Sequence, residues 1–328
     1  MSQATAKVNR EVQAFLQDLK GKTIDHVFFV ACGGSSAIMY PSKYVFDRES
    51  KSINSDLYSS NEFIQRNPVQ LGEKSLVILC SHSGNTPETV KAAAFARGKG
   101  ALTIAMTYKP ESPLAQEAQY VAQYDWGDEA LAINTNYGVL YQIVFGTLQV
   151  LENNTKFQQA IEGLDQLQAV YEEALKQEAD NAKQFAKAHE KESIIYTMAS
   201  GANYGVAYSY SICILMEMQW IHSHAIHAGE YFHGPFEIID ESVPFIILLG
   251  LDETRPLEER ALTFSKKYGK KLTVLDAASY DFTAIDDSVK GYLAPLVLNR
   301  VLRSYADELA EARNHPLSHR RYMWKVEY

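Results

Sequence analysis

The stretch SLVILCSHSGNTPETVKAAAFARGKG, residues 75–100, decides the fold because it holds one complete strand, loop and helix. Its first six residues are those of a strand buried on both faces, and the part from Pro87 onward has a helical composition. HVFFVACGGSS, residues 26–36, precedes it as a similar strand with a glycine turn, and another strand begins at Ala101. Strands that alternate with helices indicate a doubly wound parallel sheet of the α/β class.

The second half of the chain repeats this pattern. Residues 193–205, SIIYTMASGANYG, correspond to the first strand and its glycine turn, and residues 244–276 correspond to the unit above. The offset between the copies is constant: 168 residues separate Gly33 from Gly201, and the two loops are related by the same number. The repeat predicts two similar α/β domains in tandem.

The chain is expected to have five parts. The linker between the two domains is rich in Gln, Glu, Lys and Ala, which favours a helix. The parts are an N-terminal helix at 1–20, a first domain at 21–152, the helical linker at 153–192, a second domain at 193–313, and a tail at 314–328 that closes over the site.

Composition limits the classes of function. A net charge of −9 over 328 residues argues against nucleic-acid binding through a basic surface. Cys32, Cys80 and Cys213 lie in apolar segments without metal-binding or CxxC spacing, as expected of reduced core cysteines. The N-terminus lacks a signal-peptide core and the apolar runs are too short to span a bilayer, so we expect a cytoplasmic protein that binds no membrane.

The loop SHSGNTPET, residues 81–89, has the features of a phosphate site. Ser81, Ser83 and Thr86 bring three hydroxyls to the start of a helix, whose free N–H groups and dipole favour an anion. Ser35, after the neighbouring strand, would approach the same point, because ligands in such sheets bind at the carboxyl ends of strands. The alternative is an ordinary N-cap.

The corresponding loop of the second half reads GLDETRP, residues 250–256, and has lost the serines. Only one copy of the scaffold has kept the hydroxyl cluster. The contrast predicts one phosphate site per chain.

Glu217 is the candidate catalytic base. Residues 204–220 are apolar nearly all round and predict a buried helix, with Ser200 and Asn203 as its caps. A carboxylate near the C-terminal end of that helix meets desolvation and the negative end of the dipole, and both raise its pKa. A glutamate of this kind is a useful base near neutral pH. The alternative is a glutamate that faces solvent or pairs with an arginine.

Four histidines lie between Glu217 and Pro235. They invite a metal site, but HExxH spacing is absent, and we expect no metal. His233 lies beside Gly234-Pro235, where it can be held rigidly at a cleft as a general acid. The roles of the remaining members of the group stay open: His222, His224, His227 and Glu230, which is either structural or orients His233.

ACGGSS from Ala31, SHSGNT from Ser81, and HAGEYFHGP after Glu217 resemble the sugar isomerase (SIS) domain family. The resemblance covers nearly the whole chain as two SIS domains in tandem. The chain is similar to the isomerase half of glucosamine-6-phosphate synthase. Through MEMQWIHS and RRYMWKVEY it most resembles the fructosamine-6-phosphate deglycases.

This resemblance implies two five-stranded parallel sheets flanked by helices, in a homo-oligomer of at least two chains with the active site near the subunit interface. It matches Glu217 with the base that moves a proton between C1 and C2 of the sugar. It matches His233 with a histidine of ring opening or general acid catalysis, which the synthase takes from the neighbouring subunit. The implied phosphate ligands are Ser35, Ser81, Ser83 and Thr86. Further candidate substrate contacts are Gly34, His82, Asn85, Ser200, Arg321 and Lys325.

Two departures from the synthase bear on function. The synthase carries a glutaminase domain that supplies ammonia, for which this chain has no room, so an amine is expected to be released. The synthase also has a tail lysine five residues after a proline. The same count from Pro316 ends at Arg321, which cannot form a Schiff base, while Lys325 lies four residues later. Arg320 and Arg321 are candidates to hold an oxyanion or a carboxylate, or they are surface charges.

The sequence therefore predicts a fructosamine-6-phosphate deglycase. It would convert a 6-phosphofructosyl amino acid and water to glucose 6-phosphate and a free amino acid by reversing the Amadori rearrangement, with no cofactor. One alternative is an aldose–ketose isomerase or an amino-sugar-phosphate deaminase that uses the same residues. Another is a sugar-phosphate sensor without catalysis.

Overall fold

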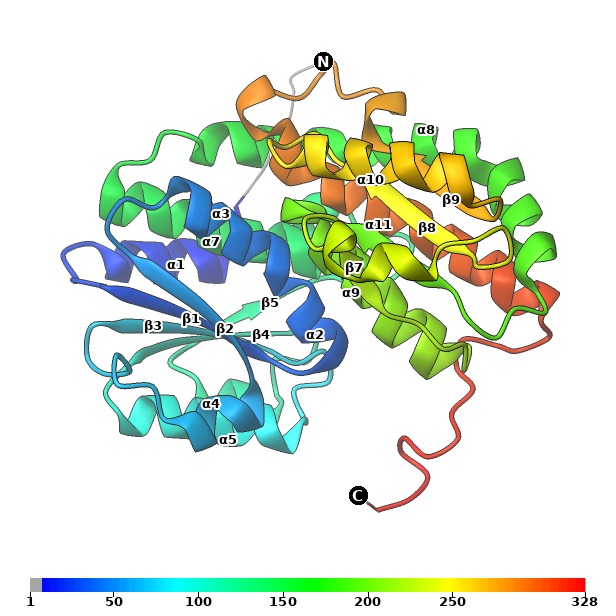
Figure 1. Ribbon diagram of the computed structural model, residues 1–328. Helices are drawn as coiled ribbons and strands as arrows, with labels where there is room; N and C mark the ends of the chain where they lie inside the picture. Colours follow the sequence, from blue (N-terminus) through cyan, green and yellow to red (C-terminus); the bar gives the residue numbers. More distant parts are fainter. Residues whose placement is uncertain (1–7, 328) are drawn as a thin grey trace. The chain divides into compact units, whose positions relative to one another are not determined.

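The computed structural model describes residues 8–327, which divide into two compact units (Figure 1). Within the described residues, the first comprises 8–168 and 285–289, and the second comprises 169–284 and 290–327. Part of the expected N-terminal helix is present as α1, Arg10–Leu19, while residues 1–7 lie outside the described residues. The predicted domain boundaries and linker stay a prediction.

Unit 1 contains the five-stranded parallel sheet that its sequence predicts. The strands are β1 His26–Ala31, β2 Asn54–Ser59, β3 Ser75–Cys80, β4 Leu102–Thr107 and β5 Tyr120–Gln123. Their order is β2-β1-β3-β4-β5, and every residue of β1, β3 and β4 is buried. Continuous apolar runs are what a sheet covered on both faces requires.

Helices cover both faces of this sheet (Figure 1). α4 Ser60–Arg66 and α5 Pro87–Gly98 lie on one face and share a core with β1 and β3 that includes Phe28, Phe63 and Leu79. The other face carries α1 together with α3 Met39–Glu49 and α7 Asn136–Glu152. The short elements are α2 Gly33–Ala37, α6 Pro113–Glu117 and the 3₁₀ turn η1 Ala132–Asn134.

Unit 2 has a parallel sheet of four strands among the described residues, and the expectation of a fifth is wrong there. The strands are β6 Tyr196–Ala199, β7 Ala225–His227, β8 Phe245–Leu249 and β9 Leu272–Asp276, in the order β7-β6-β8-β9. This order repeats the first four strands of unit 1. After β9 the chain enters η6 Ala277–Ser279 and two aspartate-initiated turns, and α11 Asp287–Ala312 then begins, so no extended segment remains to pair with β9.

The remaining helices of unit 2 complete its fold. α8 Phe157–His189 begins in unit 1 and covers most of the expected linker. A core that includes Met198, Tyr231 and Ile247 lies between the sheet and α10 Arg255–Tyr268. The short elements are η2 Gly201–Asn203, α9 Tyr204–Ser209, the π-helix η3 Tyr210–Met218, η4 Tyr231–His233 and η5 Pro235–Ile238.

The helix expected at 204–220 is therefore α9 continued by η3. Its second half is a π-helix. This form is rare in proteins as a whole, and where it does occur it is often at a functional site. The helix ends at Met218 because Trp220 takes a left-handed backbone conformation, with φ 55°. Ser200 and Asn203 occupy the N-cap positions of η2 and α9, as the sequence predicts, but neither side chain makes a capping hydrogen bond.

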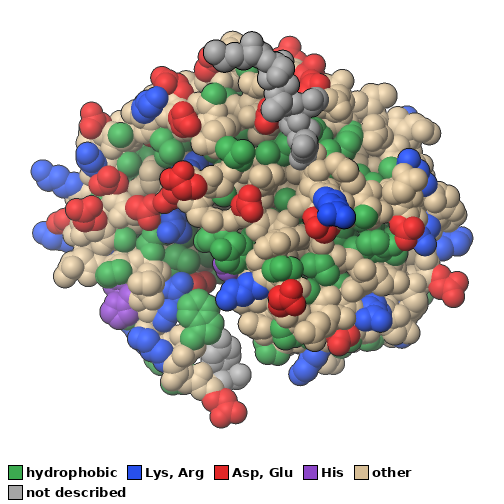
Figure 2. All heavy atoms as spheres, turned by 180° about the vertical axis from the view of Figure 1, so that it is seen from behind, with side chains coloured by type: hydrophobic (Ala, Val, Ile, Leu, Met, Phe, Trp, Pro, Cys, Tyr) green, Lys and Arg blue, Asp and Glu red, His purple; other side chains and the backbone are tan. Residues whose placement is uncertain are grey.

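The described surface is mixed in charge. On the face shown in Figure 2, acidic and basic side chains are interspersed and form no broad basic area. Within residues 8–327, none of the helices combines the length and apolar character needed to cross a membrane.

Candidate active site

The loop after β3 gathers its hydroxyls at the N-terminus of α5. Ser81 Oγ lies 2.9 Å from Thr86 Oγ1 and accepts a hydrogen bond from the Gly84 amide at 3.1 Å. Ser83 Oγ accepts from the Asn85 amide at 3.2 Å. Thr86 occupies the N-cap position without a capping hydrogen bond from its side chain, so an ordinary cap does not explain it. The loop offers hydroxyl and N–H donors to an anion, as the sequence predicts.

Gly84 makes the sharp turn of this loop possible. Its φ of 66° lies in the left-handed region, which favours glycine. A Cβ at this position would also overlap the Ser112 side chain. Both the backbone conformation and the available space therefore require glycine, and the turn brings Ser81 and Thr86 together.

Ser35 approaches the same loop from the carboxyl-terminal end of the adjacent strand. β1 and β3 are neighbours, with Ala31 opposite Cys80, and Ser35 follows β1 within α2. The Ser35 hydroxyl lies close enough to the side chain of Cys80, the last residue of β3, to act on the pKa of its thiol, which it lowers. Burial raises the pKa of the Cys80 thiol to about 12, so the sulfur stays protonated. Ser35 and Ser81 thus flank the point where strand order reverses, which is where ligands bind in open α/β sheets.

His82 lies in an aromatic cluster that the sequence analysis missed. Its ring stacks on Tyr108 with centroids 5.3 Å apart and lies 4.7 Å from Trp126. Its Nδ1 is 3.1 Å from the Tyr124 hydroxyl. Burial, together with the charge of Lys109, lowers the pKa of His82, so the ring is neutral at physiological pH. Only a contact map could have found the cluster, because its members come from three separate loops.

The second loop is filled by the chain's own carboxylate. Asp252 Oδ1 accepts hydrogen bonds from the Thr254 amide at 2.7 Å and the Thr254 hydroxyl at 2.6 Å. Its Oδ2 accepts from the Ala202 amide at 3.1 Å. Donors that would face a phosphate are thus taken by Asp252, and its charge would repel an anion. This supports the prediction of one phosphate site per chain.

Ser200 is engaged in the same network. The residue is fully buried, and its hydroxyl lies 3.0 Å from Thr254 Oγ1 and donates to Glu258 Oε1 at 3.0 Å. Glu258 also accepts from the Ser200 amide at 2.9 Å and the Gly250 amide at 2.7 Å. The role of Ser200 as a substrate contact stays a prediction.

Glu258 should make stability depend on pH. Burial raises its pKa from 4.5 to about 7, although its hydrogen bonds act in the opposite direction. Between these two values the native state holds a proton that the unfolded state has lost. The free energy of unfolding should therefore fall as pH rises through this window, by about 3 kcal/mol in all. Urea denaturation of the wild type and of Glu258→Gln at pH 5, 6, 7 and 8 measures the difference. If the free energies of unfolding of the two proteins depend on pH in the same way, Glu258 is not the source of the pH dependence.

Glu217 lies near the C-terminal end of η3 with a side chain that is 25% exposed. Burial raises the pKa of its carboxyl, and the Arg320 guanidinium partly opposes this rise. Nη2 of Arg320 lies 2.9 Å from Oε1 of Glu217. The raised pKa agrees with the sequence prediction, and so does the alternative of a pair with an arginine. The pair also brings the C-terminal tail onto the candidate base.

His233 is exposed at the end of η4. Gly234 follows with a φ of 138°, a backbone conformation that favours glycine. Within residues 8–327, no hydrogen bond or ion pair joins the side chains of Glu217 and His233. In the structure Glu217 is paired with Arg320, and His233 is exposed.

The other histidines lie along the edge of the second sheet. The backbone of His222 bonds to residues Ser193 and Ile195, and the His224 carbonyl accepts from Thr197. His227 Nδ1 accepts from the Gly229 amide at 3.1 Å. Among the described residues, no three His, Cys, Asp or Glu side chains are grouped as a metal site would need.

Arg321, a candidate substrate contact in the tail, lies over the Trp220 ring at 4.2 Å from its centroid. Lys325 follows Tyr322 in a turn and donates its amide to the Tyr322 carbonyl at 2.8 Å. Neither contact assigns a catalytic role, and the roles of Arg321 and Lys325 as substrate contacts stay predictions.

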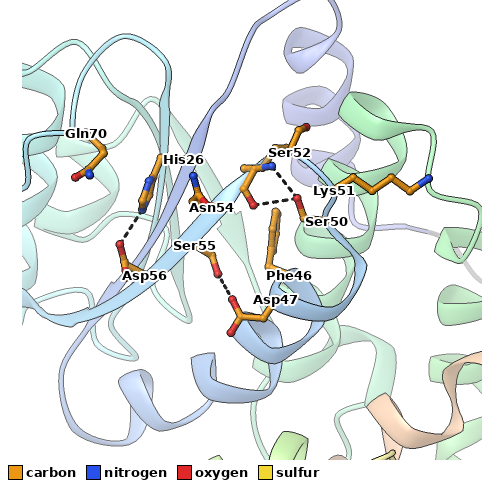
Figure 3. Close-up of a pocket in the computed structure, with 11 residues that line it drawn as sticks. His26, Phe46, Asp47, Ser50, Lys51, Ser52, Asn54, Ser55, Asp56 and Gln70 are labelled. Atoms are coloured by element: carbon orange, nitrogen blue, oxygen red, sulfur yellow. Dashed lines mark hydrogen bonds and ion pairs between the residues drawn. The ribbon is translucent and has the colours of Figure 1, made fainter.

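A cavity of about 500 Å³ lies at the amino-terminal ends of the strands of the first sheet (Figure 3). It is lined by His26 and Asn54, the first residues of β1 and β2, and by Asp56, whose carboxylate is 2.9 Å from His26 Nε2. Because all strands of a parallel sheet run in the same direction, the cavity lies at the amino-terminal ends of the strands and Ser81 lies at their carboxyl-terminal ends. It is therefore separate from the candidate phosphate site.

Comparison with known proteins identifies the family. The family described as "SIS domain" matches residues 22–150. Fructosamine deglycase FrlB of Bacillus subtilis (strain 168) is 98% identical over 328 residues, which is all of both chains. Fructoselysine 6-phosphate deglycase of Escherichia coli (strain K12) is 30% identical over 315 residues, covering 95% of this chain and 89% of that one.

A solved structure extends the likeness to both units. The C-terminal domain of glucosamine-fructose-6-phosphate aminotransferase from Francisella tularensis superposes with a TM-score of 0.77 and covers 96% of this chain and 91% of that one. At 18% identity this likeness concerns the fold alone. The match to the SIS domain family and the likeness to the two deglycases show the family: the protein belongs to the SIS domain family.

Proposed function

We propose that the chain is a deglycase that cleaves 6-phosphofructosyl amino acids with water into glucose 6-phosphate and a free amino acid. The observation that carries this proposal is Glu217, a half-buried carboxylate with a raised pKa at the end of a π-helix. The substrate class is supported by the two deglycases, at 98% and 30% identity. The hydroxyl loop of unit 1 accounts for a phosphate on that substrate.

The phosphate supplies the binding energy. Ser35, Ser81, Ser83 and Thr86 donate hydroxyl hydrogen bonds to its oxygens, and the N-terminus of α5 adds a favourable dipole. Gly34 and Asn85 are proposed as further contacts of the substrate. A phosphate held in this way restricts the sugar, so that part of the cost of orienting C1 is met on binding.

The chemistry then needs one base and one acid. Ring opening exposes the C2 ketone, and Glu217 removes a proton from C1 to give an enaminol. Return of a proton to C2 gives the imine of glucose 6-phosphate. Water adds at C1, the C1–N bond breaks, and the amine leaves with a proton. This sequence is a hydrolysis that reverses the Amadori rearrangement and is neutral in redox terms.

His233 is proposed as the acid, supplied by a second copy of the chain in a homodimer or larger assembly. Its exposure supports this arrangement. The three free cysteines and a phosphorylated substrate support the cytoplasm as its location.

Mixing two inactive variants tests the shared site. Unfolding and refolding equal amounts of Glu217→Gln and His233→Ala should restore about a quarter of wild-type activity. Half of the dimers are then mixed, and each mixed dimer has one intact site of two. Each variant refolded alone is the control. No recovery in the mixture, with dimers confirmed by light scattering, would place both groups in one chain.

The function itself is tested by product release. Purified protein is incubated with 6-phosphofructosyl amino acids linked through the α- or the ε-nitrogen, and glucose 6-phosphate is followed with a coupled dehydrogenase. Release from either substrate supports the deglycase. Turnover of fructose 6-phosphate or glucosamine 6-phosphate alone would instead indicate an isomerase or a deaminase. Binding without turnover of any of them would indicate a sensor.

A further inference from the structure

The contact between Arg320 and Glu217 is incomplete on the side of the arginine. Nη2 of Arg320 is 2.9 Å from Oε1 of Glu217, but Nε is buried and has no hydrogen-bond partner among the described residues. Nε and Nη2 form the edge of a guanidinium that a carboxylate fills with both oxygens. Glu217 therefore fills only half of this edge. A complete pair is found elsewhere in unit 2, where Arg255 binds Asp276 through two contacts of 2.7 and 2.8 Å.

The rest of the Arg320 side chain is fixed by the tail. Its Nη1 donates to the Leu317 carbonyl at 2.6 Å and to the His319 carbonyl at 2.9 Å. The side chain is only 8% exposed, so the guanidinium is held in place with one edge directed at Glu217. The tail that holds it, residues 316–327, contains turns and bends but no helix or strand. Arg320 is therefore already positioned for an anion that competes with Glu217 for this edge.

The pair works against the role proposed for Glu217. A carboxylate next to a guanidinium binds a proton less tightly, and Arg320 lowers the pKa that burial has raised. General-base catalysis of C–H removal is most effective when the pKa of the base is near the working pH. Glu217 is thus a weaker base while Arg320 is bound to it than it would be if the guanidinium were occupied by another anion.

The proposed substrate brings such an anion. An amino acid joined through its nitrogen to C1 of the sugar carries a carboxylate, whereas sugar phosphates such as fructose 6-phosphate do not. Two oxygens of a carboxylate could fill both Nε and Nη2, where Glu217 fills one. Resting on the proposed function, we propose that Arg320 determines specificity: the carboxylate of the substrate takes Arg320 from Glu217 and thereby frees the base.

The test compares two substrates that differ only in this carboxylate. These are 6-phosphofructosyl glycine and 6-phosphofructosyl methylamine, assayed for glucose 6-phosphate release. The wild type should turn over the methylamine conjugate with a kcat at least about ten-fold lower, because Glu217 stays paired; ten-fold corresponds to about 1.4 kcal/mol. In Arg320→Gln the two kcat values should converge, and kcat for the methylamine conjugate should rise above that of the wild type.

Two variants separate this role from a merely structural one. Arg320→Lys keeps a positive charge beside Glu217, so it should show no gain with the methylamine conjugate. Arg303→Gln makes the same change in an exposed arginine of α11 and should keep the wild-type ratio. A gain of activity on removing a residue is not expected if the residue only supports the fold.

The failures of the two proposals are distinguishable. If the wild type releases no glucose 6-phosphate from either conjugate, the proposed function is wrong, and this inference is wrong with it. Equal kcat values for the two conjugates in the wild type would overturn the inference alone. So would a ratio that is the same in Arg320→Gln and the wild type.

Discussion

Replacing Glu217 with glutamine should lower kcat by about 10² to 10⁴-fold, the range that one positioned acid–base group contributes. Glutamine has nearly the same shape but cannot accept the C1 proton. The substrate should still bind, since the substitution leaves the proposed phosphate ligands Ser81 and Thr86 unchanged. Steady-state kinetics give kcat, and isothermal titration of the variant with substrate gives its Kd.

Glu241→Gln is the matched control for this prediction. Glu241 is 77% exposed in its side chain and pairs with Lys270 at 3.8 Å, so the same substitution there should leave kcat unchanged. A Glu217→Gln variant that keeps more than about a tenth of the wild-type kcat would show that another group removes the proton.

Replacing Ser81 with alanine should raise KM by about 10 to 150-fold, with a smaller effect on kcat. A hydrogen bond to a charged group contributes about 1.5–3 kcal/mol, which gives this range. Ser81 also lies at the centre of its loop, since it contacts both Thr86 and the Gly84 amide. Initial rates over a wide substrate range separate KM from kcat.

Ser112→Ala serves as the control for the loop. Ser112 lies against Gly84, and its hydroxyl is buried without a partner among the described residues. Its removal should therefore leave KM unchanged. If Ser81→Ala and Ser112→Ala have equal KM values, phosphate recognition does not depend on the hydroxyls of this loop.

The sequence was most informative where a short segment determines its own structure. Buried parallel strands need continuous apolar runs, so β1, β3 and β4 were recognisable, and so was the repeat that relates β6 and β8 to them. The serines and glycine at 81–84 predict an anion-binding turn, because each residue type has a local reason to be there.

What the sequence could not show depends on contacts between distant segments. The π-helix η3 has no marker in its apolar sequence, and the missing fifth strand depends on how residues 277–286 turn before α11. Glu217 and Arg320 are far apart in the chain, so their pairing appears only once the tail is placed. The carboxylate of Asp252 likewise fills the second loop through a contact with Ala202.

The central claim, a reversed Amadori rearrangement, is tested most directly with a substrate that carries two deuterium atoms at C1. The mechanism removes one hydrogen from C1 and returns one to C2. The product should therefore be glucose 6-phosphate with a single deuterium at C1, which NMR spectroscopy and mass spectrometry can measure. A product that is fructose 6-phosphate with both deuterium atoms still at C1 would contradict the account, because the C–N bond would then have broken without proton removal.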